Sequence, residues 1–468
     1  MTMEIVRDKG TLSTVIDGGY CIGCGGCAAV SPDIEITSEG CGQYKASLPK
    51  ISVIETEKAL SVCPFSDNGF HEDALGRMFF GENASHDSRL GWHEALYAGY
   101  VAEGSFRKRG ASGGFTTWIL AQLLKDGLVD AVIHVRPADR QETGALFRYS
   151  ISRTEEEITS RAKSRYYPVE ISEVIAEVRR VPGKYVFVGL PCFVKTVRRL
   201  AEQDQVIRER VVYTVGLVCG HLKSASFSDA LAWEQDIPPG ELKEIDFRVK
   251  LSERDASDYG VYLRSEEKES VSPVRASISG DWGLNFFRYS ACDYCDDVFA
   301  ETADIAVGDA WLPNYSNDTE GNSVVVVRSI ALAQIVARAR ADGRLSLDVL
   351  SADHMAQSQA GGLRDRREGL AFRLFQKHAA GAWTPKKRVL PSDALSEKRK
   401  RIYEQRSKLR QLSHSYWSQA VSARDFNVFR ESLAPHISEM RGLYSRPIPL
   451  MIAGKLYRAL KRLKRRYF

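Results

Sequence analysis

Three cysteines near the N-terminus, Cys21, Cys24 and Cys27, have the spacing C-x2-C-x2-C. In proteins with two iron–sulfur clusters this run continues to C-x2-C-x2-C-x3-C-P, and the fourth cysteine of each run ligates the cluster of the other run. Here Ser31 takes the place of the fourth cysteine. Cys63, followed by proline, ends a second run that has lost its first three cysteines. These two losses remove the ligands of one cluster and leave a complete set for the other.

This set predicts a ferredoxin-like module over residues 1–70 that holds one 4Fe–4S cluster. The neighbouring glycines let the backbone wrap closely and point N–H groups at the sulfur atoms. The alternative is a structural zinc ion, because four thiolates also form a tetrahedral zinc shell. Two C-x2-C steps that share their central cysteine favour the cluster. Cys41, between two glycines, is predicted to lie on a turn and not to be a ligand.

The composition is that of a folded protein and supports a metal role for the cysteines. Of the 468 residues, 44% are hydrophobic and 27% are charged, which argues against global disorder. Nine cysteines are too few for a disulfide scaffold in a chain of this length. The first ten residues are charged without an apolar stretch, and no apolar run reaches the ~20 residues that span a bilayer. We therefore expect a cytoplasmic protein without a secretory signal.

Beyond a polar connector over residues 71–94, short apolar runs alternate with amphipathic stretches. This alternation is typical of an α/β core, which we place at residues 95–350, with antiparallel strands expected over 240–280. Residues 351–468 are predicted to form a helical, basic C-terminal extension. The predicted strands are Ala98–Ala102, Val129–Val135, Tyr185–Gly189, Val211–Cys219, Ile305–Val307 and Ser323–Val327, and the predicted helices are Gly114–Asp126, Val194–Gln203, Ile330–Asp342, Arg364–Gly381 and Ala394–Val421.

Four further cysteines are spread through the predicted core. Cys192 and Cys219 each come at the end of a predicted strand, and Cys292 and Cys295 form a C-x2-C pair. Strand ends and turns could bring these four together around a second cluster. The alternative is a pair of buried cysteines, which behave as small apolar side chains, plus a zinc-like hairpin. The spacing alone leaves both interpretations open.

Six sequence elements, listed at the end of this paragraph in chain order, resemble the family of beta subunits of coenzyme F-420 hydrogenase and dehydrogenase. The resemblance covers roughly residues 15–330 and implies FAD and one or two 4Fe–4S clusters. It favours a second cluster bound by Cys192, Cys219, Cys292 and Cys295. The chain departs from the family by keeping one complete N-terminal ligand set and by extending well past the family core. The six elements are the N-terminal cysteine run, 111–115 (ASGGF), 162–166 (AKSRY), 188–192 (VGLPC), 216–221 (GLVCGH), and 292–295 (CDYC) with 303–311 (ADIAVGDAW).

The glycine-rich turn before the predicted helix Gly114–Asp126 is a candidate phosphate site. Such a turn offers free N–H groups and the positive end of the helix dipole to a phosphate. The alternative is a helix cap without a ligand. The resemblance implies that the ligand is the pyrophosphate of FAD. The residues of this candidate site are Lys108, Arg109, Ser112, Gly113 and Gly114.

Two other segments are candidates for the same site. Ser164, Arg165 and Tyr166 could supply a polar and aromatic contact to FAD, or they could form a surface loop. Asp309 is predicted to lie in a tight turn after a strand, at the edge of the sheet where α/β proteins bind ligands, with a capped turn as the alternative. His221 could donate to a sulfur or to substrate, or it could be a structural histidine.

Together these features predict an iron–sulfur flavoprotein oxidoreductase with a mixed-sheet α/β flavin-binding core. Electrons would pass between a ferredoxin-like donor, two 4Fe–4S clusters and FAD, because clusters carry electrons singly and a flavin passes them in pairs. The sequence identifies neither the substrate nor a catalytic residue. The family resemblance implies a small molecule or a glycan precursor of surface-polysaccharide biosynthesis. The alternatives are chemistry on the deazaflavin coenzyme F-420 itself and a non-catalytic electron-transfer or scaffold subunit.

The net charge of +5 is concentrated at the C-terminus. Nine basic and no acidic residues lie in 441–468, and without these nine the net charge is −4. We therefore expect no nucleic-acid partner. Ile448–Phe468 spaces apolar residues at near-helical intervals with Lys and Arg between them, as in a basic helix that lies on an anionic membrane. The alternatives for this segment are a helix packed on the body and a frayed end.

Overall fold

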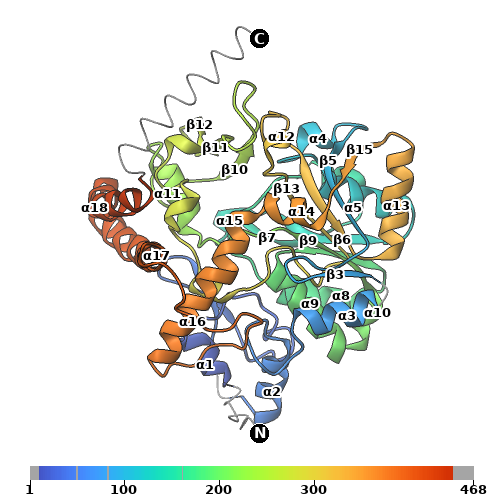
Figure 1. Cartoon of the computed structure of the whole chain (residues 1–468), viewed down its shortest axis with the longest axis horizontal. Coiled ribbons are helices and arrows are strands. Elements are labelled where there is room, and N and C mark those ends of the chain that lie inside the picture. The colour runs from blue at the N-terminus through green and yellow to red at the C-terminus, as the bar shows by residue number, and fades with distance from the viewer. Residues whose placement is uncertain (1–9, 49–50, 82–83, 161, 446–468) are drawn as a thin grey trace.

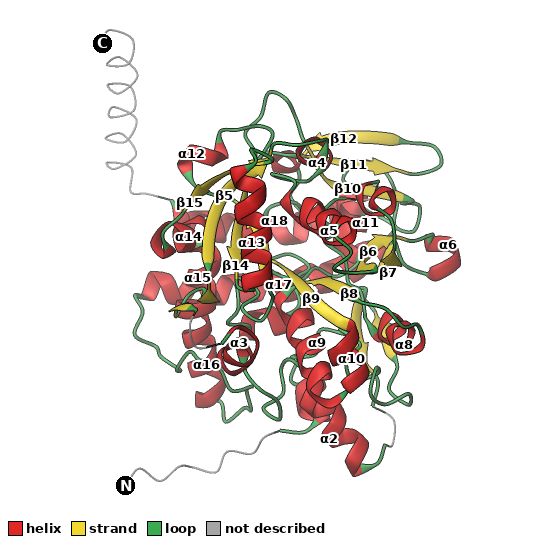
Figure 2. Ribbon diagram, turned by 90° about the vertical axis from the view of Figure 1, so that its right-hand side faces the viewer, coloured by secondary structure: helices red, strands yellow, loops and turns green. Residues whose placement is uncertain are grey.

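The core of the structure is an eight-stranded mixed β-sheet (Figures 1 and 2). The structure is a computed structural model and describes residues 10–48, 51–81, 84–160 and 162–445. The strand order is β15-β5-β14-β13-β9-β8-β6-β7. The strands are β5 (Ala95–Val101), β6 (Ala131–Pro137), β7 (Phe147–Ser152), β8 (Tyr185–Gly189), β9 (Val211–Leu217), β13 (Ile305–Asp309), β14 (Ser323–Val327) and β15 (Leu345–Val349).

The four strands β13, β9, β8 and β6 run parallel, and antiparallel strands extend the sheet on both sides. Every residue of β8 and β14 is buried, because these strands lie inside a sheet that is covered on both faces. Ile305 of β13 lies opposite Val215 on one side and Val327 on the other. The carboxyl ends of the four parallel strands therefore meet at one edge of the sheet, and the predicted mixed α/β class is confirmed.

Helices cover both faces of this sheet. Because neighbouring residues of a strand point to opposite faces, Val186 packs with Trp118 and Leu332 in one core, and Phe187 packs with Phe193 in the other. The first core contains α5 (Phe115–Lys125), α7 (Glu155–Thr159) and α13 (Ile330–Ala341), and the second contains α8 (Ser172–Arg180), α9 (Pro191–Gln203) and α10 (Gln205–Arg210).

A three-stranded antiparallel sheet occupies residues 244–273, as predicted for this region. Phe227, on α11 (Ser226–Trp233), stacks on Phe247 of this sheet with ring centroids 6.0 Å apart. The strands are β10 (Glu244–Val249), β11 (Gly260–Arg264) and β12 (Glu269–Pro273). Shorter connecting helices are α4 (Phe106–Arg109), α6 (Arg140–Thr143), α12 (Pro313–Ser316) and the 3-10 turns Val274–Ala276, Trp282–Leu284 and Ser290–Tyr294.

The N-terminal module consists of two helices and a hairpin. Helix α2 begins with a capping box in which the side chains of Ser52 and Glu55 each accept a backbone N–H of the other residue, and Cys63 directly follows its last residue. The helices and strands of the module are short, as expected for a segment organised around its cysteines. Its elements are α1 (Leu12–Asp17), β1 (Ile36–Glu39), β2 (Gln43–Ala46) and α2 (Val53–Val62).

The segment 71–94 is more ordered than the predicted connector. It contains helix α3 (Glu72–Phe80) and a hairpin of β3 (Ser85–Asp87) and β4 (Gly91–His93). The segment is polar by composition, but within its described residues it is not an irregular connector, because Leu75, Phe80 and Leu90 are buried against the rest of the chain.

The C-terminal region is helical, as predicted, and packs against the core (Figure 1, orange to red). Trp417 lies edge-on to Phe287 and Phe429, with ring centroids 5.7 and 5.9 Å away, and these aromatic contacts attach the last two helices to the body. The elements are α14 (Ala352–Ser358), α15 (Ala360–Arg364), a π-helical turn (Asp365–Gly369), α16 (Leu370–Ala379), α17 (Glu397–Ala423) and α18 (Phe426–Tyr444).

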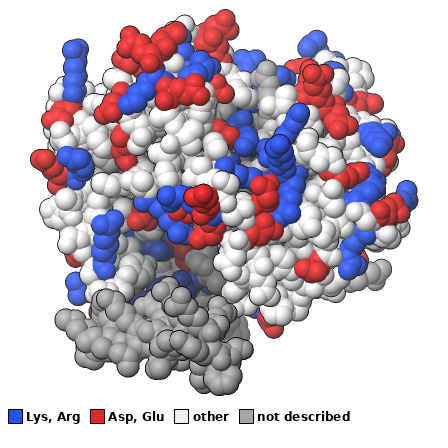
Figure 3. Space-filling view, turned by 90° about the horizontal axis from the view of Figure 1, so that it is seen from above, with Lys and Arg blue, Asp and Glu red and all other residues white. Residues whose placement is uncertain are grey.

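No helix within the described ranges is long and apolar enough to cross a bilayer. On the face seen in Figure 3, Lys and Arg side chains are interspersed with Asp and Glu. The predicted amphipathic segment Ile448–Phe468 lies outside the described residues, so its membrane contact stays a prediction.

Candidate functional site

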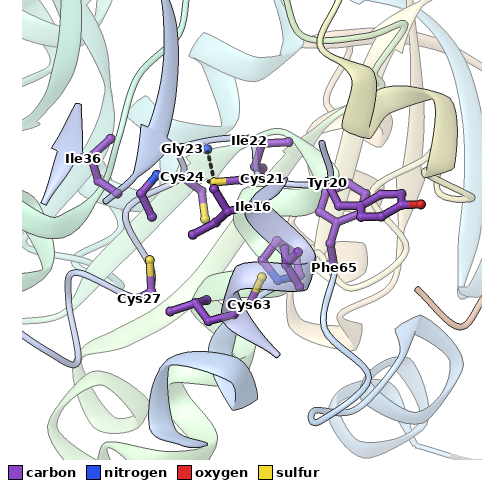
Figure 4. Close-up of a pocket in the computed structure, with 14 residues that line it drawn as sticks. Ile16, Tyr20, Cys21, Ile22, Gly23, Cys24, Cys27, Ile36, Cys63 and Phe65 are labelled. Carbon is purple, nitrogen blue, oxygen red and sulfur yellow. Dashed lines mark hydrogen bonds between the residues drawn. The ribbon is translucent and has the colours of Figure 1, made fainter. Parts of the chain in front are cut away.

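Cys21, Cys24, Cys27 and Cys63 surround one cavity in the N-terminal module (Figure 4). The cavity is small, and the rest of its wall is mainly apolar, with Ile16 among its residues. Figure 4 shows the sulfur atoms turned toward this space, three from the loop after α1 and one from the end of α2. The structure therefore brings together the four cysteines that the spacing predicts as one set.

Burial raises the pKa of these thiols. The pKa of Cys24 rises to about 12 and that of Cys63 to about 11, and neighbouring thiols of the set add to the effect of burial. The Cys21 sulfur accepts backbone N–H groups of Gly23 (3.4 Å) and Ala46 (3.5 Å). Such N–H groups stabilise a sulfur that carries negative charge. Among the described residues, no three or more His, Cys, Asp or Glu are arranged to hold a single metal ion.

The second set of four cysteines meets at the carboxyl ends of the parallel strands. Cys219 lies two residues after β9, and Cys292 and Cys295 lie in and directly after the 3-10 turn Ser290–Tyr294. Burial raises the pKa of Cys192 well above its usual value, and the thiols of Cys295, Cys219 and Cys292 raise it further. The four thiols therefore lie within electrostatic reach of one another.

Helix α9 links the two cysteine sets. It begins at Pro191 and not, as predicted, at Val194, because proline is favoured at the first position of a helix. Cys192 is therefore in the first turn of the helix. One turn later, the Thr196 hydroxyl donates to the Cys192 carbonyl (2.9 Å) and lies 3.7 Å from the Cys24 sulfur. The two sets thus meet across a single helical turn.

A deep cleft opens at the same edge of the sheet. It has about 1540 Å³ of empty space, including the solvent at its mouth, and is lined by residues from the ends of β6, β8, β9 and β13 and from the N-terminus of α5. Cys219 is one of its lining residues, so the second cysteine set borders the cleft. Ligands bind at this edge in open α/β sheets. The predicted cofactor residues that line the cleft are Ser112, Gly114, Ser164, Arg165, Tyr166 and Asp309.

Three other predicted cofactor residues do not line the cleft. Lys108 and Arg109 are exposed on α4. Gly113 faces the sheet, where a Cβ atom would lie 2.6 Å from the Gly99 carbonyl oxygen and 2.7 Å from the Ser323 nitrogen. Glycine is therefore needed at position 113 for packing against the strands and not for the approach of a phosphate. The candidate site excludes these three residues.

The first turn of α5 faces the cleft. Gly114 caps this helix with φ +83° and ψ 0°, a left-handed conformation that glycine adopts without strain. The Ser112 hydroxyl donates to the Asn322 carbonyl (2.7 Å), so it fixes the turn. Thr116 and Thr117 line the cleft beside them. The N–H groups of a first helical turn have no acceptor within the helix, and this turn therefore suits an anion.

Asp309 is not in the predicted tight turn. It is the last residue of β13, opposite Ser323, so the strand continues two residues further than predicted. Its carboxylate accepts two hydrogen bonds from the buried Arg248 guanidinium, at 2.9 and 3.0 Å. The Tyr166 hydroxyl lies 3.4 Å from the same guanidinium. Asp309 therefore acts as the counter-ion of Arg248 and helps to fix the wall of the cleft.

Lys223 and Trp282 also line the cleft, and neither is predicted from the sequence. The Lys223 side chain is buried, and its ammonium donates to the Phe286 carbonyl (2.6 Å) and lies 4.8 Å from the Trp282 ring. Burial, with a contribution from the nearby Arg288, lowers the pKa of Lys223 to about 7. Neither Lys223 nor Trp282 belongs to a sequence motif, so only the fold could reveal them.

His221, considered from sequence, lies beside them. Its ring centroid is 4.6 Å from that of Trp282. Its Nε2 atom is buried and has no hydrogen-bond partner among the described residues. A buried polar atom without a partner is costly, and it faces a cleft large enough for a ligand. The ring is therefore placed to bond to whatever occupies the cleft.

The class of this protein is defined by an α/β sheet with a cleft and one cysteine set at its ligand edge, and by a second cysteine set in the adjoining N-terminal module. Residues 96–176 match the N-terminal part, and residues 183–353 the C-terminal part, of the coenzyme F-420 hydrogenase/dehydrogenase beta subunit. Together these matches cover more than half of the 468 residues. The chain belongs to this family, which confirms the resemblance noted from the sequence.

Individual relatives agree with this family. One of the subunits of the F(420)H(2) dehydrogenase of Methanosarcina mazei is 24% identical over 319 residues, which are 65% of this chain and 79% of that protein. The coenzyme F-420-dependent sulfite reductase of Methanocaldococcus jannaschii is 23% identical over 334 residues, 68% of this chain and 46% of that protein. A structure of the F-420-reducing NiFe hydrogenase complex from Methanosarcina barkeri aligns with 62% of this chain and 96% of that chain, at 18% identity and a TM-score of 0.48.

Lys223→Met is expected to change how stability depends on pH. The pKa of Lys223 is about 7 in the folded protein and 10.5 for an ordinary lysine, so between these values the unfolded chain binds more protons. The free energy of unfolding of the wild type therefore increases as the pH rises from 7 to 10, because the proton that Lys223 loses when the chain folds is released more easily at higher pH. A methionine at this position removes that increase. The melting temperature of the variant relative to the wild type should be highest at pH 7 and fall by several degrees toward pH 10.

Lys268→Met is the matched control, because Lys268 is 41% exposed at its side chain and pairs with Asp236 on the surface. Its melting temperature relative to the wild type should change little with pH. If the Lys223 and Lys268 variants showed parallel curves, Lys223 would not titrate near neutral pH.

Proposed function

We propose that this chain is an iron–sulfur flavoprotein oxidoreductase. It passes electrons between a ferredoxin-like donor, two 4Fe–4S clusters and FAD, and reduces a small-molecule substrate. The observation that carries this proposal is the contiguity of three sites. Thr196 contacts Cys24 of the N-terminal set and Cys192 of the second set. Cys219, a member of the second set, also lines the cleft. Carriers placed in such a row, in a protein interior, suit electron transfer.

The donor chemistry of both cysteine sets fits a 4Fe–4S cluster. Each set supplies four thiols, which is the number that a cluster needs. In each set a backbone N–H is directed at a sulfur, from Gly23 to Cys21 at 3.4 Å and from Leu222 to Cys292 at 3.3 Å. Hydrogen bonds of this kind tune the potential of a cluster. Zinc stays the alternative that the sequence left open for the N-terminal set, although the described residues do not bring three of these thiols together around a single ion.

The size and the lining residues of the cleft support FAD as its ligand. The first turn of α5 would hold the pyrophosphate, and Arg165, another lining residue of the cleft, would supply a counter-charge. Tyr166 and Trp282, whose rings lie 4.8 Å apart, offer aromatic surface to an isoalloxazine, and Nε2 of His221 would gain a partner. FAD, when bound, supplies a carrier that takes electrons singly and passes them in pairs. Lys223 can hold or release a proton near neutral pH at the wall of this site.

The relatives favour a second candidate, which is chemistry on the deazaflavin coenzyme itself. One relative belongs to an F(420)H(2) dehydrogenase and another is a coenzyme F-420-dependent reductase. A non-catalytic electron-transfer subunit is the third candidate, and a glycan precursor as substrate stays a prediction from the sequence. Flavin content separates the catalytic candidates from the scaffold. Reduction of the deazaflavin by the flavin-loaded protein separates the first two candidates.

Iron content tests the two clusters. Anaerobically purified full-length protein should contain about eight irons per chain, and Cys24→Ala should contain about four, because a cluster that loses a ligand is rarely retained. Cys41→Ala is the matched control and should keep all eight. Cys41 lies on the turn after β1, as predicted, and its thiol donates to the His414 carbonyl at 3.3 Å. Zinc in place of iron in the wild type, or full iron in the Cys24 variant, would reject the N-terminal cluster.

Flavin binding is tested at Thr116, in the first turn of α5. Thr116→Glu places a carboxylate where the pyrophosphate would lie, although a negative charge at a helix N-terminus by itself stabilises the helix. We expect this variant to fold and to retain less than about a tenth of the wild-type flavin, since one pair of like charges in a cleft costs over ~1.4 kcal/mol. Thr116→Gln, of the same shape without the charge, should retain most of it. Equal flavin content in both variants would place the pyrophosphate elsewhere.

A further inference from the structure

A buried arginine from the segment beyond the family match lies beside the second cysteine set. The match ends at residue 353, and Arg366 lies in the π-helical turn Asp365–Gly369 that follows. Its side chain is 2% exposed, and its Nη2 donates to the carbonyl of Gly220, the residue after Cys219, at 2.7 Å. Irregular turns of this kind are frequent at functional sites, because they redirect side chains out of the helical register.

Arg366 lies within electrostatic reach of three thiols of this set. Burial lowers the pKa of its guanidinium, whereas Cys295, Cys219 and, to a smaller extent, Asp365 raise it, and the net direction is upward. In return, Arg366 lowers the pKa of Cys219 and Cys292 against the effect of their burial. The Nε atom of Arg366 is buried and has no hydrogen-bond partner among the described residues. One donor of this buried guanidinium is therefore unsatisfied within the described residues.

The carboxylates nearby are already paired with other arginines. Asp365 lies 3.0 Å from Arg288 and 3.2 Å from Arg373, and Asp293 lies 3.2 Å from Arg288. Arg406 and Arg410 lie 3.7 and 3.0 Å from the same two carboxylates. These arginines thus share two carboxylates. Asp365 interacts more strongly with Arg373, Arg288 and Arg406 than with Arg366, and within the described part of the chain no carboxylate lies within 4.0 Å of Arg366.

An isolated buried cation is costly unless an anion compensates it. A 4Fe–4S cluster with four thiolates is an anion, and its reduction adds one more negative charge. A fixed cation beside it favours the reduced state and so raises the reduction potential. Asp297 acts in the opposite direction, because its carboxylate raises the pKa of Cys219.

We propose that Arg366 is the counter-charge of the second cluster and sets its reduction potential from a segment outside the family core. This inference rests on the proposed function, since it requires that cluster. Arg366 is a positioning and tuning residue and does not touch substrate. A merely structural role, through its bond to the Gly220 carbonyl, would leave the potential unchanged.

The test is a redox titration of the full-length protein, followed by electron paramagnetic resonance. In Arg366→Gln, the ratio of oxidised to reduced second cluster at a fixed potential should rise about tenfold, which is a midpoint lower by ~59 mV for one electron. The N-terminal cluster in the same sample is the internal control and should not shift. Arg366→Lys keeps the charge and should restore most of the wild-type midpoint.

Arg406→Gln is the matched control for the network. Arg406 lies 3.7 Å from Asp365 and is partly exposed, so its loss should shift the midpoint far less. An unchanged midpoint in Arg366→Gln with full iron would overturn the inference and leave the proposed function intact. If Arg366→Gln loses the second cluster, Arg366→Lys must restore the iron, and failure to do so would also overturn it. A wild type with about four irons would overturn the second cluster itself, before any variant is compared.

Discussion

The placement of eight buried or partly buried cysteines in two adjacent sets is the constraint on which the rest of the structure depends. A buried thiolate is unfavourable, and burial accordingly raises the pKa of Cys24 to about 12 and that of Cys219 to about 12. Cations gather beside both sets and partly offset this cost. Arg199 and Lys195 lower the pKa of Cys63, and Arg366 does the same for Cys219. The charge distribution thus prepares both sets for an anionic occupant.

The same constraint explains how the C-terminal region holds the molecule together. Arg388, past the end of α16, lies 2.8 Å from Asp73, 2.5 Å from Glu301 and 3.2 Å from Asp296. Tyr20 directly precedes Cys21, and its hydroxyl donates to the carbonyl of Trp383 at 2.8 Å. Buried ion pairs of this kind contribute little net stability compared with apolar packing, but they fix geometry. Here Arg388 fixes the C-terminal region to α3 and to the core, and the Tyr20 hydrogen bond attaches the N-terminal module to the same C-terminal region.

The sequence pattern predicted the helices and strands correctly where short-range hydrophobic periodicity determines the secondary structure. The strand Tyr185–Gly189 was predicted with its observed bounds, because a short apolar run between turn signals is buried on both faces. The prediction failed where tertiary contacts decide. The segment 71–94 is polar by composition, yet its few apolar side chains are enough to fix α3 against the core.

The site divides in the same way. Cysteine spacing identified the N-terminal set, because ligand chemistry imposes it on the sequence, whereas the second set needed the family resemblance to favour it. The sequence Gly113-Gly114 could not show which glycine faces the cleft. That depends on the positions of the strands that carry Gly99 and Ser323, which pack against Gly113. Lys223 and Arg366 carry no local signal at all. Each gains its proposed role only because the fold removes it from water beside a cleft or a thiol set.

The extension also limits how far properties of the relatives can be transferred to this chain. Two strand ends that border the cleft are held from outside the family match, where Gln359 donates to the Asp309 carbonyl at 2.8 Å and Arg366 donates to the Gly220 carbonyl at 2.7 Å. Asp309 in turn fixes Arg248 and, through it, the Tyr166 wall. Residues outside the family match therefore shape the electrostatics and one wall of the cleft. Specificity follows the groups that line and support a pocket, so the family match alone does not carry the substrates of the relatives over to this chain.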